Sequence, residues 1–166
     1  MKKNIAFVSL KAKFCKDICK MFCDRFELMF ADIYDILQYN MVNQQMLNVA
    51  GQQYFNAEEQ KVIKNVVTCE NIGVNIDFYL TNKADNLNII KQNCLIVYLK
   101  FTKELLQKYN SIVGKQNSKL LVAYEAEDKI CQSFADVVVD VSGNNKTDIK
   151  ILQIKLKNFI KFKVKI

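Results

Sequence analysis

The chain of 166 residues contains no histidine, and this absence limits the chemistry that its other side chains can support. A Ser–His or Cys–His nucleophile system needs an imidazole as its general base, so both systems are excluded. Carboxylates and lysines remain, but no paired acidic motif stands out as a general acid and base. The groups left to consider are thiols, ammonium groups and single carboxylates.

Three of the six cysteines could form a site because of their spacing. Cys15, Cys19 and Cys23 lie four residues apart, so they line one stripe of a helix. A zinc or iron–sulfur site would need a fourth ligand, and the spacing matches no ligand pattern of such sites. We therefore predict no metal, and interpret the stripe as small side chains that pack against a sheet.

Cys15 carries a separate hypothesis. It falls near the expected start of a helix, beside Lys13 and Lys16. A helix N-terminus and neighbouring ammonium groups both stabilise a thiolate. These surroundings predict a lowered thiol pKa for Cys15 and leave a redox or nucleophilic role open.

The hydrophobic pattern indicates which elements position these side chains. Continuous apolar runs, typical of buried parallel strands, predict strands at residues 5–10, 95–99 and 137–141. Helical spacing predicts helices over residues 14–26, 33–48 and 57–67, and further helices after Thr102 and Thr147. The acidic pair Glu58 and Glu59 would then lie in the first turn of the 57–67 helix. This alternation predicts an α/β fold, a three-layer α/β/α sandwich around a mostly parallel central sheet.

Length and composition predict one domain over residues 1–160 and a basic C-terminal tail over 161–166, because no linker or repeat divides the chain. No apolar run is long enough to span a membrane. The apolar stretch that follows Met1 is too short for the core of a signal peptide. We expect a cytoplasmic protein whose thiols stay free, because the cytoplasm is reducing.

The net charge of +7 favours polyanions as partners, but its distribution weakens that interpretation. Residues 146–166 carry seven lysines and only one acidic residue, Asp148. A lysine cluster lacks the planar fork with which arginine recognises phosphates, so a solvated basic face is favoured over a nucleic-acid site. Weak polyanion binding through the Lys-rich tail stays open as an alternative. The aromatic residues fall at helix or strand spacing and are expected in the core.

Several segments, taken in order, are similar to one known family. They are Asn4-Ile5-Ala6-Phe7-Val8, Phe30-Ala31-Asp32, residues 51–59, residues 95–99, Lys119-Leu120-Leu121 and residues 135–140. Residues 51–59 read Gly-Gln-Gln-Tyr-Phe-Asn-Ala-Glu-Glu and resemble the stretch Gly-Glu-x-x-Phe-Arg-x-x-Glu of the shikimate kinases. The resemblance covers nearly the whole chain. It implies the fold of the nucleoside-monophosphate-kinase-like phosphate-loop proteins and an ATP-dependent kinase ancestry.

The chain departs from this family first at the phosphate-binding loop, Gly-x-x-Gly-x-Gly-Lys-Ser/Thr. Here residues 9–16 contain no glycine. The glycine positions fall on Ser9, Ala12 and Phe14, the lysine position on Cys15 and the hydroxyl position on Lys16. A phosphate nest needs closely approaching amides, which a side chain such as Phe14 obstructs. Lys16 is also rotated by about 100° from the lysine position if the helix starts there.

The resemblance implies equally large departures at the substrate side. Asp32 remains of an acidic pair whose second member falls on Tyr34, and the carboxylate-binding arginine falls on Asn56. The triple-glycine loop falls near Gly73, the lid arginine near Ser118 and the late substrate arginine near Glu127. Glu127 would repel a substrate carboxylate. Asp32 and Glu59 are interpreted as hydrogen-bonding or helix-capping residues.

Two functions follow from this comparison. The first is a shikimate-kinase-like pseudoenzyme that keeps the fold for binding or interaction, with no cofactor and with a protein or small-molecule partner that the sequence does not name. The alternative is a working small-molecule kinase that uses Mg-ATP, in which Lys16 (or Lys11 or Lys13) reaches the phosphates and Asp32 holds magnesium. An open, amide-lined concavity at residues 9–17 would favour the second function, and a turn filled by Leu10 or Phe14 the first.

Overall fold

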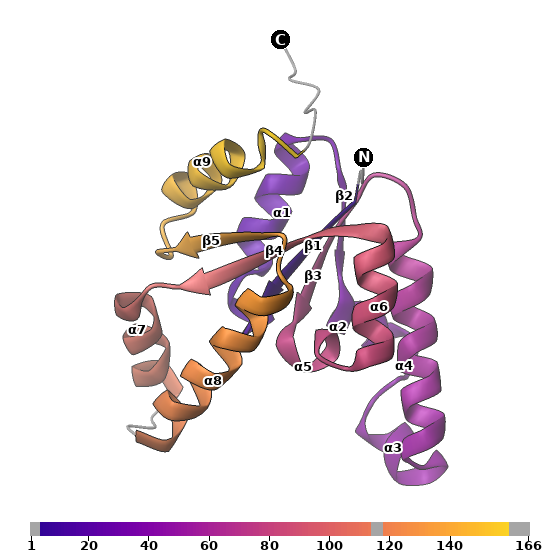
Figure 1. Cartoon of the computed structure of the whole chain (residues 1–166). Coiled ribbons are helices and arrows are strands. Elements are labelled where there is room, and N and C mark those ends of the chain that lie inside the picture. The colour runs from indigo at the N-terminus through magenta and orange to yellow at the C-terminus, as the bar shows by residue number, and fades with distance from the viewer. Residues whose placement is uncertain (1–3, 114–117, 160–166) are drawn as a thin grey trace.

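The computed structural model describes residues 4–113 and 118–159, with the side chains at 110–122 also outside the described part. A parallel sheet forms its centre, in the order β2-β3-β1-β4-β5 (Figure 1). Its strands are β1 (Asn4–Ser9), β2 (Met29–Asp32), β3 (Ile72–Asp77), β4 (Cys94–Phe101) and β5 (Val137–Val141). The predicted α/β class with a parallel sheet is confirmed.

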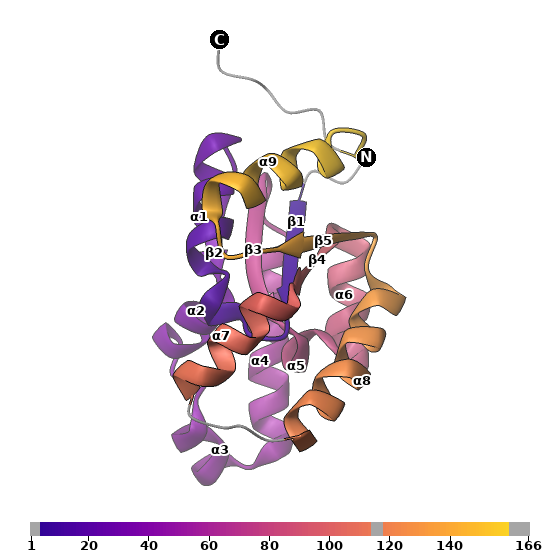
Figure 2. The ribbon, with the colours of Figure 1, turned by 90° about the vertical axis from the view of Figure 1, so that its left-hand side faces the viewer.

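Helices cover both faces of the sheet (Figures 1 and 2). On one face lie α1 (Lys16–Arg25) and α9 (Asn145–Leu156), and on the other α4 (Gln52–Val67), α6 (Ala84–Asn93) and α8 (Ser118–Phe134). The remaining helices are the 3-10 turn η1 (Ala12–Phe14), α2 (Ile33–Tyr39), α3 (Gln44–Ala50), α5 (Phe78–Thr81) and α7 (Lys103–Val113). Among the described residues, no helix combines the length and the apolar character that a membrane crossing requires.

Successive side chains of β1 point to opposite faces of the sheet, and each face has its own hydrophobic cluster. Ile5 and Phe7 pack with α1 and α9, whereas Ala6 and Val8 pack with the helices of the other face. This two-sided burial explains the continuous apolar run of the first strand. The division into a domain and a tail stays a prediction, because residues 160–166 lie outside the described part.

The cysteine stripe packs as predicted. Cys15, Cys19 and Cys23 are all buried on α1 and its N-terminal end, against the sheet. Gly73 lies in β3 directly beneath the end of this stripe, and a Cβ atom there would come within 2.3 Å of Cys23 Sγ. Gly73 is therefore a close-packing residue, and the structure places it in a strand of the sheet rather than in a loop.

Two helix predictions need correction. The pattern over residues 33–48 forms two helices, α2 and α3, because Met41 adopts a positive φ of 59° and Asn43 accepts the first amides of α3. The helix predicted to begin at Ala57 begins at Gln52, after Gly51 with φ 85°. Glu59 therefore lies within α4, where the Lys83 ammonium is 2.5 Å from its Oε1, and not in a first turn.

The central strand β3 was not predicted from hydrophobic pattern. Its sequence alternates apolar residues with Gly73, Asn75 and Asp77, which interrupt the run that marks the other central strands. All six positions are nevertheless buried, because β3 pairs with β1 on one side and β2 on the other. Pairing with two neighbours, rather than local composition, makes this segment a strand.

Candidate functional site

A crevice of about 420 Å³ opens at the carboxyl ends of β1, β2 and β3. In open α/β sheets this edge is where ligands bind. The turn after β1 contributes basic side chains, and the ends of β2 and β3 contribute carboxylates and tyrosines. The lining residues are Leu10, Lys11, Ala12, Lys13, Lys16, Asp32, Tyr34, Asp35, Asp77 and Tyr79.

The turn after β1 closes on itself through its own backbone. The Phe14 amide donates to the Lys11 carbonyl at 3.0 Å, and the Cys15 amide donates to the Ala12 carbonyl at 2.9 Å. Leu10, Ala12 and Cys15 are buried in the turn. Two of the amides that a phosphate nest would present are therefore already used inside the 3-10 turn.

Asn75 of β3 holds this turn in place. Its Nδ2 atom donates to the Ala12 carbonyl and to Asp32 Oδ2, each at 2.9 Å, and its Oδ1 accepts from the Cys19 thiol at 3.7 Å. The side chain is almost completely buried. A buried amide with all these partners joins the turn, β2 and α1 into one rigid unit.

The two buried carboxylates of the crevice both cap helices. Asp32 accepts the Asp35 amide at 3.1 Å at the start of α2, in addition to the bond from Asn75. Asp77 accepts the Leu80 amide at 3.1 Å at the start of α5, and its other oxygen accepts from the Tyr34 hydroxyl. Each carboxylate thus caps a helix with one oxygen and accepts a side-chain hydrogen bond with the other.

Tyr34 is a hydrogen-bond donor in this site. Burial raises its pKa above the ordinary value of 10.0, and the hydrogen bond to Asp77 raises the pKa further. The hydroxyl consequently stays protonated at neutral pH. It positions Asp77 rather than acting as a base.

The lysines at the crevice differ in their engagement. Lys16 forms an ion pair with Asp35, and this hydrogen bond raises the pKa of its ammonium group. Both partners are well exposed, so the pair is worth little and opens readily. Lys13 Nζ lies 5.0 Å from the centroid of the Phe14 ring, and both Lys13 and Lys11 are exposed. The crevice therefore presents exposed ammonium groups beside the hydrogen-bonded carboxylates of Asp32 and Asp77.

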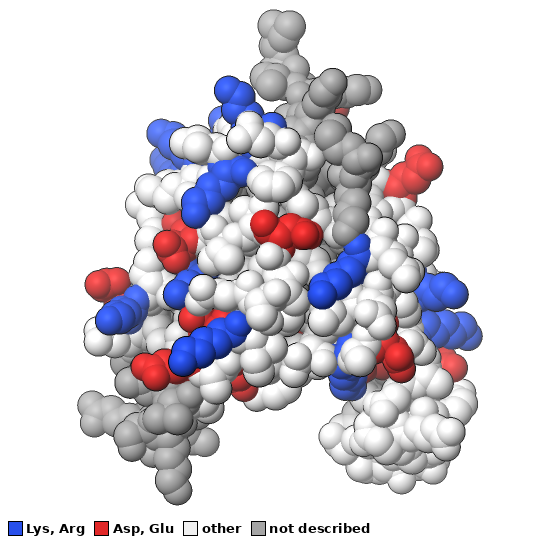
Figure 3. Space-filling view, in the orientation of Figure 1, with Lys and Arg blue, Asp and Glu red and all other residues white. Residues whose placement is uncertain are grey.

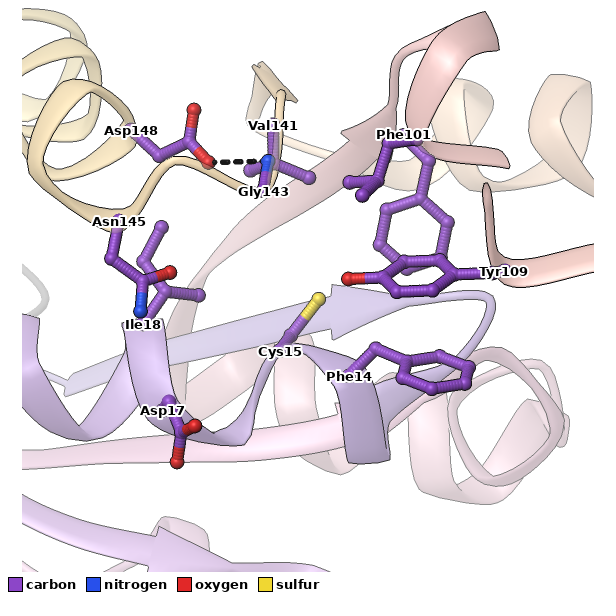
Figure 4. A pocket seen from close by; sticks show the side chains of 11 residues that line it. Phe14, Cys15, Asp17, Ile18, Phe101, Tyr109, Val141, Gly143, Asn145 and Asp148 are labelled. Carbon is purple, nitrogen blue, oxygen red and sulfur yellow. Dashed lines mark hydrogen bonds between the residues drawn. The ribbon is translucent and has the colours of Figure 1, made fainter. Parts of the chain in front are cut away.

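A second cavity of about 190 Å³ lies on the other side of the turn, between α1, α7 and the start of α9 (Figure 4). The Phe14 ring stacks on Tyr109 with centroids 3.9 Å apart and an interplanar angle of 9°. The charged residues that line this cavity are Asp17 and Asp148. Asp148 is buried and accepts the amides of Ser142 and Gly143 at 3.0–3.1 Å.

Cys15 points into this second cavity (Figure 4), and its predicted activation is wrong. Burial raises the pKa of its thiol from 9.0 to about 12, which the neighbouring Ser9 hydroxyl offsets only in part. The helix N-terminus and the lysines, which were expected to favour the thiolate, are outweighed by desolvation. The thiol therefore stays protonated at neutral pH.

The structure brings together only some of the residues that the sequence singled out. Ala12, Lys16, Asp32 and Tyr34 line the crevice, and Glu127 of α8 reaches its rim by accepting from the Tyr79 hydroxyl at 3.5 Å.

Other residues lie away from the crevice. Ser9 is fully buried at the end of β1, and Phe14 and Cys15 line the second cavity. Asn56 lines a groove between α4 and α6, where its Oδ1 accepts from Gln52 at 2.7 Å. The side chain of Ser118 is outside the described part.

Sequence reasoning missed Asn75, Asp77 and Tyr79. Asn75 and Asp77 occupy the carboxyl half of a buried central strand, where apolar residues are the rule. A polar residue at such a position signals a hydrogen-bonded role. The polar residues Asn75 and Asp77 indicate such a role only once residues 72–77 are known to form a buried strand.

Among the described residues, no three or more cysteines and carboxylates lie close enough together to hold a metal ion. This agrees with the engaged state of Asp32 and Asp77 described above.

This sheet order, with a crevice where the first turn meets the ends of β2 and β3, defines the nucleoside-monophosphate-kinase-like class of α/β proteins. Within this class the chain belongs to the shikimate kinase family, whose family model matches residues 17–157. The matched range begins just after the turn that follows β1. The family is one of ATP-dependent kinases. No curated protein sequence matches the chain.

Solved shikimate kinases have a similar fold. The enzyme from Acinetobacter baumannii, in complex with shikimate, superposes with a TM-score of 0.72 at 19% identity, over 95% of each chain. The enzyme from Aquifex aeolicus gives 0.73 at 17% identity, over 94% of this chain and 97% of its own. That from Bacteroides thetaiotaomicron gives 0.73 at 16% identity, over 93% and 98%.

Proposed function

We propose that this chain is a shikimate kinase family member that does not transfer phosphate and that binds a small hydroxylated acid in the crevice. The observation that supports the first part is the closed turn after β1. The Phe14 and Cys15 amides donate to carbonyls of the same turn, so they cannot also bind a phosphate. Phosphoryl transfer depends on such positioning and on charge stabilisation around the phosphates.

The residues around the turn do not fit Mg-ATP. Asp32, the residue considered for magnesium, has both oxygens in hydrogen bonds to the protein. Two further carboxylates, Asp17 and Asp148, line the cavity on the far side of the turn, where they would repel a polyphosphate. No step of a phosphoryl transfer is therefore assigned to these residues.

The second part of the proposal rests on the charges of the crevice. Lys11 and Lys13 are exposed there and suit a carboxylate or another small anion. The hydroxyl oxygens of Tyr34 and Tyr79, whose protons are donated to Asp77 and Glu127, keep lone pairs that can accept hydrogen bonds from the hydroxyl groups of the same ligand. A volume of about 420 Å³ accommodates a molecule of that size.

Thermal unfolding with added ligands tests both parts. We expect no change in Tm with Mg-ATP, and a rise of about 3–6 °C with the best of a panel of hydroxylated carboxylic acids, shikimate included, at roughly tenfold excess over Kd. Lys11→Ala should reduce that rise, whereas Lys20→Ala, a lysine of α1 outside the crevice, should leave it unchanged. A Tm rise with Mg-ATP would contradict the first part, and no response to the whole panel would contradict the second.

A working kinase is the second candidate, because Lys16 and Asp32 do share the crevice and the Lys16–Asp35 pair is exposed. It predicts that a coupled assay with ATP detects turnover of a hydroxylated acid. Lys16→Ala and Asp32→Ala would each abolish this turnover, with Lys20→Ala as the control. We expect no turnover from the wild-type chain, under conditions in which a solved shikimate kinase serves as the positive control.

A further inference from the structure

Lys16 and Asp35 both line the crevice, where they form an ion pair. Lys16 is the first residue of α1, and Asp35 lies in the first turn of α2. The pair therefore joins two helices, through residues that are 19 positions apart along the chain. A carboxylate of the chain itself thus already occupies one of the ammonium groups that the crevice presents.

The Asp35 side chain can leave this pair at low cost. It is 65% exposed, and within the described part of the chain the hydrogen bond to Lys16 is the only one that its carboxylate forms. The backbone amide of Asp35, and not its carboxylate, is what Asp32 accepts at 3.1 Å to cap α2. The cap of α2 is therefore kept when the Asp35 side chain turns toward solvent.

Lys16 is the lysine of the crevice that is best placed to hold an anion. Its side chain is 41% exposed, whereas Lys11 and Lys13 are exposed residues of the turn, and a shielded charge is screened less by salt. Lys16 also begins a helix of ten residues, and the N-terminal end of a helix attracts negative charge. The Lys13 ammonium lies over the ring of Phe14, which lines the other cavity.

We propose that Asp35 is an internal competitor for the acid group of the ligand, and that the ligand carboxylate displaces Asp35 from Lys16 when it enters the crevice. This inference rests on the proposed function, because it names the residue that receives the carboxylate of the hydroxylated acid. It also names the residue that limits how tightly this acid binds.

The charges that line the crevice explain why the exchange is favourable. Three lysines and three aspartates line it: Lys11, Lys13, Lys16, Asp32, Asp35 and Asp77. Asp32 and Asp77 are held by hydrogen bonds from backbone amides and from side chains, so Asp35 is the carboxylate whose position can change. When Asp35 leaves, the ligand brings a carboxylate in its place, and the balance of charge around Lys16 is kept. A neutral polyol has no such group and leaves the pair closed.

The strength of the ion pair sets the size of the effect. An exposed ion pair is weak, so it leaves about 15–40% of the molecules with the pair open. The apparent Kd of a ligand is its intrinsic Kd divided by this open fraction. Competition by Asp35 therefore weakens the binding of an acid by about two- to sixfold, and the repulsion between the two carboxylates adds to this.

Isothermal titration calorimetry of the full chain tests the exchange. The probe is the acid of the panel, shikimate included, that raises the Tm most. Asp35→Asn should lower the Kd of this acid by about three- to tenfold, because it removes the competing charge. The matched control is Asp24→Asn, which removes the carboxylate of another exposed ion pair of α1, with Lys20, and changes the net charge equally. It should change the Kd by less than about twofold, because this pair lies outside the crevice.

Two further measurements separate the exchange from a general effect of charge. In a Lys16→Ala background, Asp35→Asn should lower the Kd by less than about twofold, because no ammonium group is left for the two carboxylates to share. The methyl ester of the same acid carries no charge, so Asp35→Asn should leave its Kd unchanged.

The outcomes distinguish this inference from the proposed function. The exchange is overturned, and the proposed function stands, if the acid binds the wild-type chain but Asp35→Asn tightens binding no more than Asp24→Asn does. An equal gain in the Lys16→Ala background, or for the ester, overturns it as well. If no acid of the panel binds either the wild-type chain or Asp35→Asn, the proposed function is wrong and the exchange is wrong with it.

Discussion

Burial decides the chemistry of the cysteine side chains. Cys15, Cys19, Cys23 and Cys131 are buried, and burial raises the pKa of each thiol from 9.0, to about 12 for Cys15, Cys23 and Cys131. For Cys15, the neighbouring lysines and the helix start predicted a lowered thiol pKa. Desolvation of the buried thiol raises the pKa by more than these groups lower it. The residue types were readable from the sequence, and their solvent exposure was not.

The buried thiols predict that the protein loses stability at alkaline pH. In the unfolded chain a thiol ionises near pH 9.0, whereas in the folded chain it stays protonated until about pH 12. The stabilisation is therefore complete below pH 9 and is lost as the pH rises toward 12, at about 1.4 kcal/mol per pH unit for each such thiol.

Urea unfolding at a series of pH values from 8 to about 10.5 measures this slope. Cys23→Ala removes one of the titrating groups and should reduce the slope by about one proton. A free energy of unfolding that does not fall above pH 9 would contradict the assignment.

At the scale of elements, the contact between α1 and β3 sets the architecture around the crevice. Gly73 permits the cysteine stripe of α1 to lie directly on the sheet. Asn75, two residues further along β3, fastens the turn that precedes α1. The strand β3, which the hydrophobic pattern did not predict, therefore positions both α1 and the turn after β1.

Gly73→Ala tests this contact. The new Cβ would lie 2.3 Å from Cys23 Sγ and 3.2 Å from Phe7 Cε2, so we expect a loss of about 1–3 kcal/mol in the free energy of unfolding. The double variant Gly73→Ala/Cys23→Ala removes the sulfur that the new methyl group meets. It should be more stable than the sum of the two single changes implies. Strict additivity in urea unfolding would show that the two residues do not touch.

At the level of the whole molecule, positive and negative side chains are interspersed on the surface that Figure 3 shows. On the face shown in Figure 3, lysine and arginine side chains alternate with aspartate and glutamate. Much of the net charge of +7 comes from the seven lysines of residues 146–166, of which 160–166 lie outside the described part. This distribution supports the interpretation of a solvated basic surface.

The tail remains the place where a polyanion would bind, and we expect that binding to be weak. Reversal of three tail charges in Lys161→Glu/Lys163→Glu/Lys165→Glu should abolish binding of a short DNA duplex. The control makes the same change in net charge at three exposed lysines of the body: Lys61→Glu, Lys64→Glu and Lys129→Glu. Fluorescence anisotropy at several salt concentrations measures both. Binding that survives high salt, or that the tail variant retains, would exclude this role.

Much of the fold followed from local pattern. The apolar runs marked β1, β4 and β5, since strands buried on both faces must be continuously apolar. The strand β3 was not predicted, because it contains polar residues. Asn75 and Asp77 can be buried there because they form hydrogen bonds with neighbouring elements. The break between α2 and α3 was not predicted either. It depends on the positive φ of Met41, which the spacing of apolar residues does not reveal.

The sequence by itself determined that histidine chemistry is excluded, that the turn after β1 lacks glycine and that a parallel sheet forms the core, since these depend on residue type and local spacing. Only the tertiary structure decided that Asn75 donates to Asp32, that Tyr34 donates to Asp77 and that Cys15 is sealed from solvent. The first two of these pairs are each 43 positions apart along the chain. Contacts at that separation, and the burial they produce, arise from the packing of whole elements and leave no trace in a local pattern.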